Sequence, residues 1–281
     1  MPHTATRPPS LPVMIDLTTI STPRQKAIVA TIGKVDPDVI AKAEEARVRS
    51  VPIVGDDDKC HGAIYLTKLK EIAASNRELT PQDATIACNV MPHLVPVSAL
   101  LKQLGADGVV LHSADPDADD YDAAWFGIVS TADLNRPIFR AHIYQMMVIL
   151  ETSLGQLIMD DFGDDWGAIR LLSDNTQHRI KEFYDEERAE GVDLSPVTNA
   201  TLSDLFHITT ESNRIWSLIG YEHPNELRPI AHRINDLRNT IMHPVRPLIV
   251  SEKDLQEIVT AVNDVEDVTD RLMKQIGVVA S

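Results

Sequence analysis

The chain has 281 residues, of which 43% are hydrophobic and 24% are charged, so it has a globular composition and enough length for two domains. Its formal net charge of −16 at pH 7 argues against broad, nonspecific nucleic-acid binding, because such binding needs a basic surface. The cysteines Cys60 and Cys88 have neither zinc-knuckle nor disulfide-framework spacing, so a reducing, cytoplasmic compartment fits them. We expect no secretion signal and no membrane span, since no apolar run approaches the required length.

The chain divides by pattern into three parts. Residues 1–13 are rich in proline and threonine and are expected to form a disordered tail. In residues 14–135, short apolar runs alternate with short helical stretches, which predicts mixed strands and helices. From residue 136 to residue 281 the periodicity is almost entirely helical. The predicted fold class is therefore α+β, with α/β repeats followed by an all-α helical bundle.

The α/β part contains a weak internal repeat. One copy covers residues 43–69, and the other covers residues 100–112 and 125–134. Each copy reads as helix, strand, turn, glycine-containing strand and helix. A repeated unit that cannot bury its own apolar face packs against its twin, so we expect the two copies to form one domain.

An acidic segment, residues 115–122, interrupts the second copy. Its Asp-x-Asp-x-Asp beginning is that of a calcium-binding loop, but Asp120 stands where such a loop needs glycine. Phe126 stands at the twelfth position, where a bidentate carboxylate is required. We therefore expect a solvated hairpin loop here. Because no His/Cys cluster of metal-ligand spacing occurs elsewhere, we expect no metal site.

The two copies carry a recognisable motif. The first copy has Val-Pro-Ile-Val at residues 51–54, followed by an acidic turn and Gly62-Ala-Ile. The second copy ends in Gly-Ile-Val-Ser-Thr-Ala-Asp-Leu at residues 127–134. On these motifs, residues 14–135 resemble a CBS-domain pair, a regulatory module. The resemblance implies a compact pair that binds an adenine nucleotide between its copies.

The resemblance assigns the nucleotide contacts to Ser130 and Asp133. A carboxylate can accept hydrogen bonds from ribose hydroxyls, and a hydroxyl at a helix start lies beside N–H groups that favour phosphate. The same spacing is also that of a helix capping box, which explains both residues without a ligand. The first copy has Tyr65 and Lys68 at these positions, so at most one site keeps the expected residues. A packing or dimerisation role for the pair stays open.

The second part of the chain predicts five helices joined by short connections, as in an antiparallel bundle. Turn residues and caps set their limits: Gly220 suits a C-terminal cap, Pro244 stops a helix, and Ser251 with Asp254 begins one. The expected helices cover about residues 137–159, 166–191, 201–219, a stretch ending at 243, and a stretch from 252 to the chain's last apolar residues.

The fourth of these helices ends in a polar cluster. Its apolar stripe, Ile230, Ile234, Leu237 and Ile241, is expected to face the bundle core. Arg238, Asn239 and His243 gather near the end of the helix, away from that stripe. A histidine can transfer protons near neutral pH, and an arginine can stabilise charge on phosphate oxygens. In RNA the adjacent 2′-hydroxyl can act as nucleophile, so this set suits metal-independent phosphodiester cleavage.

The sequence from Arg238 to His243 matches the Arg-x(4–6)-His motif, and residues 136–276 resemble the HEPN superfamily of helical domains. Many members are ribonucleases that dimerise so that two motifs line one cleft. The resemblance implies His243 as the acid and base, Arg238 as the phosphate binder and Asn239 as a positioning residue. Without catalysis, Arg238 would pair with Asp236 or with a carboxylate of a neighbouring helix. His243 would then be favoured at the helix end by the helix dipole alone.

Three functional hypotheses follow. The first is a homodimeric HEPN-type ribonuclease, with RNA as substrate, that a ligand of the CBS-like domain regulates. The second is a non-catalytic scaffold, which senses a nucleotide or only dimerises and binds a protein partner. The third is a toxin held by a separate antitoxin.

Overall fold

The structure is a computed structural model, and it describes residues 13–57, 59–86, 88–104, 109–113, 125–163, 165–192 and 194–276. The expected tail, apart from Val13, and the acidic segment 115–122 lie outside these residues. Among the described residues the chain forms two compact units. The strand unit comprises Val13–His142 and Pro247–Val259, and the helical unit comprises residues 143–246 and 260–276. The boundary expected after residue 135 stays a prediction; the unit division places residues 136–142 and 247–259 with the strands.

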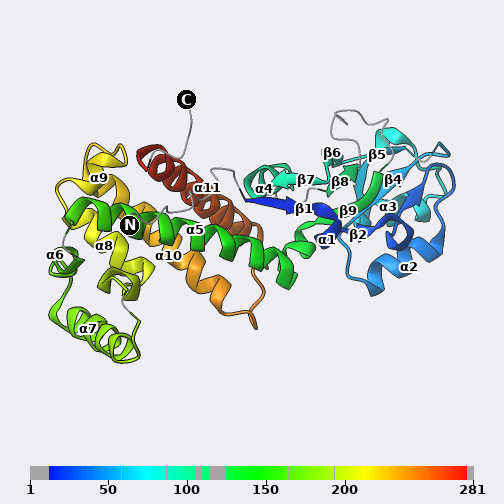
Figure 1. Cartoon of the computed structure of the whole chain (residues 1–281). Helices are drawn as coiled ribbons and strands as arrows, with labels where there is room; N and C mark the ends of the chain where they lie inside the picture. The colour runs from blue at the N-terminus through cyan, green and yellow to red at the C-terminus, as the bar shows by residue number, and fades with distance from the viewer. Residues whose placement is uncertain are drawn as a thin grey trace. The chain divides into compact units, whose positions relative to one another are not determined.

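The strand unit begins with a lead-in and a first repeat (Figure 1). The lead-in elements are β1 (Met14–Asp16), α1 (Leu17–Ile20), β2 (Thr22–Pro23) and the short 3₁₀ helix η1 (Arg24–Lys26). The first repeat consists of β3 (Ala30–Thr31), α2 (Pro37–Glu45), β4 (Ser50–Val54), β5 (Cys60–Tyr65) and α3 (Leu66–Ala74). Strand β3 pairs with β4 in parallel, and β4 pairs with β5 in an antiparallel hairpin.

The second repeat follows the 3₁₀ helix η2 (Pro81–Asp83). It consists of β6 (Cys88–Pro92), β7 (Leu94–Pro96), α4 (Val97–Leu104), β8 (Val109–Ser113), β9 (Trp125–Ser130) and the 3₁₀ helix η3 (Thr131–Asn135). Strand β6 pairs with β8 in parallel, and β8 pairs with β9 in an antiparallel hairpin. The two halves therefore share one topology, as the sequence repeat predicts. The lead-in strands add to the second half, β1 on β7 and β2 on β9.

The likeness of the two halves extends to one irregularity. In the first hairpin Ile53 pairs with Gly62 and Val54 pairs with Cys60, so His61 is an extra residue. The second hairpin has the same shift, which leaves Phe126 as the extra residue. Both bulged residues are exposed, and the burial of β5 matches that of β9 position by position. The extra residue of a bulge shifts the alternation of side chains along the strand by one position. Cys60 and Trp125, which precede the bulged residues, therefore both point into the core.

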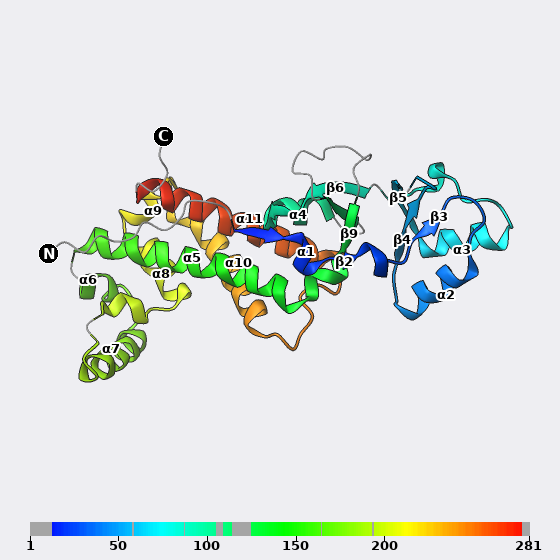
Figure 2. The same cartoon turned by 45° about the vertical axis from the view of Figure 1, so that its right-hand side comes forward.

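The sheet of the first half is buried on both faces. One face packs against α2 and α3, which lie side by side in Figure 2, and its core consists of Ala30, Val35, Ala43, Val51, Ile53, Ile64, Leu69, Ile72 and Leu79. The other face packs against the second half through Val54, Cys60, Ala63, Cys88, Trp125 and Ile128. In this seam, Cys60 and Ala63 of β5 and the equivalent residues Trp125 and Ile128 of β9 belong to one buried cluster. The twin halves thus complete each other's cores, which a single copy could not do.

The helical unit differs from the sequence prediction in two places. The predicted second helix is two helices, α6 (Asp165–Ile169) and α7 (Asp174–Ala189), and the predicted third is α8 (Leu202–Glu211) and α9 (Ile215–Leu218). The Oγ atom of Ser212 accepts the N–H groups of Arg214 and Ile215, which ends the ladder of α8. Ser173 precedes α7 in extended geometry, and Asp174 suits the first turn of that helix.

Other helix limits agree with the prediction. Helix α5 covers Pro137–Phe162 and runs three residues past its expected end. Helix α10 covers Pro224–Met242, with His243 as its cap, and Gly220 has a φ of +79° after α9. Helix α11 covers Glu252–Gln275 and begins with the predicted capping box, in which Asp254 Oδ2 accepts the N–H of Ser251 at 2.8 Å.

Within the described ranges, the apolar character and length needed to cross a bilayer do not occur together in any helix.

Candidate functional site

The structure places Ser130 and Asp133 together at the end of β9. Asp133 Oδ2 accepts the backbone N–H of Ser130 at 2.8 Å and the Ser130 hydroxyl at 2.9 Å. Its other oxygen, Oδ1, forms an ion pair with Arg136 at 2.7 Å. Arg136 also donates to the backbone oxygen of Ser21 and to Thr22 Oγ1, at 3.1 and 3.3 Å. The two predicted ligand contacts thus form a capping box that also fastens the lead-in segment.

This arrangement bears on the nucleotide prediction. The Asp133 residue is only 7% exposed, so a ribose could reach its carboxylate only if Arg136 moved aside. Ser130 is partly exposed. At the equivalent position of the first half, Lys68 forms an exposed ion pair with Glu71. The contacts assigned to Ser130 and Asp133 therefore stay a prediction, and the capping arrangement accounts for both residues.

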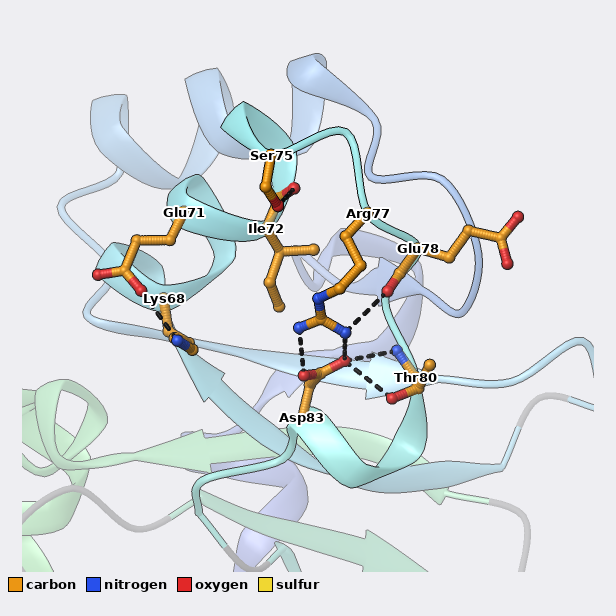
Figure 3. A network of polar contacts seen from close by, with 8 residues as sticks. All are labelled: Lys68, Glu71, Ile72, Ser75, Arg77, Glu78, Thr80 and Asp83. Atoms are coloured by element: carbon orange, nitrogen blue, oxygen red, sulfur yellow. Dashed lines mark hydrogen bonds and ion pairs between the residues drawn. The ribbon is translucent and has the colours of Figure 1, made fainter.

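A second capping box, which the sequence reasoning missed, lies at η2, in the segment of chain between the two repeats (Figure 3). Asp83 Oδ2 accepts the N–H and the hydroxyl of Thr80, each at 2.8 Å. Arg77 Nη1 donates to the same oxygen at 2.9 Å, and Arg77 Nη2 pairs with Oδ1. The Arg77 guanidinium, together with the Thr80 donors, holds the pKa of Asp83 well below its usual range. The Thr-Pro-x-Asp sequence of residues 80–83 could have revealed this box, because it has the capping-box spacing with proline at the first helical position.

Removing the Asp83 charge is expected to destabilise the fold in a pH-dependent way. At neutral pH, Asp83→Asn should lower the free energy of unfolding by about 1–2 kcal/mol, since it weakens charge-assisted hydrogen bonds. Because the folded-state pKa is depressed, this stabilisation is complete above the ordinary pKa of an aspartate and is lost as pH falls below it. The deficit of the variant should therefore shrink between about pH 5 and pH 3. Urea unfolding across this range measures it.

Asp185→Asn is the matched control, because Asp185 pairs with Lys181 on an exposed face of α7. An exposed pair one helical turn apart contributes about 0.3–0.5 kcal/mol, so this variant should stay close to the wild type. A deficit of Asp83→Asn that stays constant with pH would contradict the assignment of the stabilisation to the ionised carboxylate.

The Arg238-to-His243 motif lies at the C-terminal end of α10. Of the apolar stripe predicted for this helix, Ile234, Leu237 and Ile241 are buried, whereas Ile230 is only partly buried. Arg238 is half-buried, whereas Asn239 and His243 are exposed. Oδ2 of Asp236, one of the alternative partners expected for Arg238, lies 3.1 Å from Nδ1 of His232. The motif therefore presents an amide and an imidazole to solvent beside a partly covered guanidinium.

Glu151 of α5 belongs to the same region, and the sequence reasoning missed it. Burial raises the pKa of its carboxyl, while the positive charge of Arg238 and a hydrogen bond from the N–H of Leu202 oppose that rise. Glu151 is thus a carboxylate of a neighbouring helix whose charge interacts with that of Arg238. No local spacing relates Glu151 to the motif, since only the packing of α5, α8 and α10 brings them together.

No group of three or more histidine, cysteine, aspartate or glutamate side chains suited to a metal ion occurs within the described part of the chain.

No protein-family model matches the chain, and no curated protein matches its sequence. Among solved structures, it is similar to CBSX2 in complex with AMP, with 16% identity and a TM-score of 0.34 over 45% of this chain and 98% of that one. It is also similar to the CBS domain of a putative transporter from Clostridium difficile 630, with 14% identity and a TM-score of 0.34 over 44% of this chain and 94% of that one. A third similar structure is the CBS domain of the bacterial CNNM/CorC family Mg2+ transporter in complex with ATP, with 17% identity and a TM-score of 0.33 over 43% of this chain and 84% of that one.

Proposed function

We propose that this chain is a regulatory protein whose strand unit, a CBS-like pair of repeats, binds an adenine nucleotide. The observation that supports the proposal is the twinned construction of the unit. Its halves share one topology and one bulge, and they pack through the equivalent residues Cys60 with Ala63 and Trp125 with Ile128. This is the architecture that the resemblance of residues 14–135 to a CBS-domain pair implies.

Ser130 and Asp133 are the ligand contacts that we propose. Binding would exchange the ion pair between Asp133 and Arg136 for hydrogen bonds from ribose hydroxyls, and it would leave the Arg136 guanidinium able to meet a phosphate. AMP and ATP are named in two of the similar structures, so they are the nucleotides to test.

Calorimetric titration of the full chain with AMP and with ATP tests this function. The wild type should bind one of them, and Asp133→Asn should bind about tenfold or more weakly, as expected for the loss of a charge-assisted hydrogen bond. Asp83→Asn is the matched control, because Asp83 also sits in a capping box and pairs with an arginine. It should lose stability and keep the wild-type affinity. Equal affinities of all three proteins, or no binding by the wild type, would refute the assignment.

We propose a second activity, metal-independent RNA cleavage by the helical unit, because Asn239 and His243 are exposed beside Arg238. His243 would take the proton of a 2′-hydroxyl, and the resulting oxygen would attack the adjacent phosphorus. Arg238 would stabilise the charge on the phosphate oxygens, and Asn239 would position the phosphate. The 5′-oxygen would leave with a proton, and a 2′,3′-cyclic phosphate would remain. The resemblance of residues 136–276 to HEPN domains further implies a homodimer with two motifs in one cleft.

Cleavage of a mixed RNA substrate in EDTA tests the second activity. His243→Ala and Arg238→Ala should each lower the rate by about a hundredfold or more, the usual range for a lost proton-transfer group. His232→Ala is the control, because His232 is exposed on the same helix and pairs with Asp236 outside the motif. No cleavage by the folded wild type, with or without AMP, would favour the non-catalytic scaffold that binds a protein partner.

A further inference from the structure

The two cysteines of the chain meet in the seam between the halves of the strand unit. Cys60 is the first residue of β5 in the first half, and Cys88 is the first residue of β6 in the second half. Cys60 is 3% exposed and Cys88 is fully buried, and both belong to the seam core with Trp125 and Ile128. Both are free thiols.

Local structure explains why they meet. The bulge at His61 keeps Cys60 on the same face of β5 as Ala63. Ala63 exchanges hydrogen bonds with Ile86, from the Ala63 N–H to the Ile86 oxygen at 2.8 Å and from the Ile86 N–H to the Ala63 oxygen at 3.0 Å. Cys88 begins β6, two positions after Ile86 in the sequence, and it belongs to the same buried cluster as Cys60 and Ala63. The bulge at His61 and the bridge between Ala63 and Ile86 therefore place both thiols in one buried cluster.

Both thiols lie in this one buried cluster, and the interaction between them makes their pKa values unequal. The hydrogen bond that the Cys88 thiol donates lowers the pKa of Cys60 and raises the pKa of Cys88. The Cys60 thiol also donates to the backbone oxygen of Gly62 at 3.4 Å. Since the thiolate is the reactive form of cysteine, the lowered pKa favours Cys60 over Cys88 as the thiol that attacks first.

We propose that Cys60 and Cys88 are a redox-sensitive modification site, which closes to a disulfide between the two halves under a disulfide oxidant such as oxidised glutathione. The Cys60 thiolate attacks one sulfur of the oxidant, and one glutathione thiolate leaves and takes up a proton. The Cys88 thiolate then attacks Cys60 Sγ in the mixed disulfide, and the second glutathione leaves. Two protein thiols are oxidised by two electrons, and one oxidised glutathione is reduced to two glutathiones.

The burial of the pair sets the conditions for the reaction. A closed seam shields both sulfurs from a bulky oxidant, so the rate follows the opening of the seam. In a reducing compartment the dithiol persists, and the disulfide marks oxidising conditions. Once formed, the disulfide prevents the halves from separating. The oxidation requires neither the proposed nucleotide binding nor the proposed RNA cleavage.

Oxidation of the full chain under native conditions tests the proposal. The reduced protein is equilibrated with oxidised glutathione, quenched in acid, denatured and alkylated. The count of free thiols should fall from two to none, and a peptide pair should appear that joins Cys60 to Cys88 and lacks two hydrogen atoms. The oxidised monomer should unfold at a higher temperature than the reduced one, and dithiothreitol should reverse the shift.

Cys60→Ala and Cys88→Ala are the matched controls, because alanine is tolerated in a core and each variant keeps one thiol. Neither should show the temperature shift on oxidation. Two free thiols after equilibration, a chain-to-chain disulfide, or an oxidised protein that unfolds at a lower temperature would each overturn the proposal.

Discussion

Gly62→Ala is expected to lower the free energy of unfolding by about 3 kcal/mol or more, the sum of backbone strain and overpacking. Gly62 has a φ of +129°, which residues with a side chain rarely adopt. A Cβ atom there would lie 2.7 Å from the Cβ of Ala84 and 2.9 Å from the backbone oxygen of Ile86. Neither neighbour is the end of a flexible side chain, so the bridge between Ala63 and Ile86 would have to move.

Gly155→Ala is the control for this substitution. Gly155 lies inside α5, and a Cβ atom there would meet nothing within 4 Å. Alanine is the better helix former, so this variant should gain up to about 1 kcal/mol. Urea unfolding of both variants measures the two effects, which should have opposite signs. A neutral Gly62→Ala would show that residues 84–86 do not approach β5 as described.

Asn135→Ala should lower the free energy of unfolding by about 3 kcal/mol, because it leaves buried backbone groups without partners. The Asn135 Oδ1 atom accepts the N–H of Leu248 at 2.6 Å and that of Ile249 at 2.9 Å. Its Nδ2 atom donates to the oxygen of Ile249 at 2.9 Å. Leu248 and Ile249 are buried, so their backbone groups lose partners that solvent replaces poorly. Through these hydrogen bonds, the Asn135 side chain links residues 247–259 to the rest of the strand unit.

Asn199→Ala is the control for Asn135, since the Asn199 amide makes one hydrogen bond, to Glu187. It should cost about 1 kcal/mol or less. Denaturant unfolding compares the two variants, and hydrogen exchange at Leu248 and Ile249 should accelerate only in Asn135→Ala. Unchanged exchange at these two amides would contradict the tether.

The sequence by itself determined the features that depend on neighbours along the chain. The alternation of apolar runs predicted the strands, and the repeated order of elements predicted twin halves. Pro244 predicted the end of α10, and Ser251 with Asp254 predicted the start of α11. Ser130 and Asp133 were predicted as either a ligand site or a capping box, because a spacing of three residues serves both. These predictions are possible because helix caps, turns and the periodicity of apolar residues depend on residues within about one helical turn of each other.

The tertiary structure alone decided the features that join residues far apart in the chain. The Asn135 side chain accepts a hydrogen bond from Leu248, which lies more than a hundred residues further along the chain, and no sequence spacing predicts this bond. Glu151 comes near Arg238 only through the packing of helices, and that packing raises the pKa of Glu151 by burial. The meeting of Cys60 with Cys88 depends on a one-residue bulge, which shifts a side chain from one face of a strand to the other. Burial and contact of this kind are properties of the folded chain, and a linear pattern does not contain them.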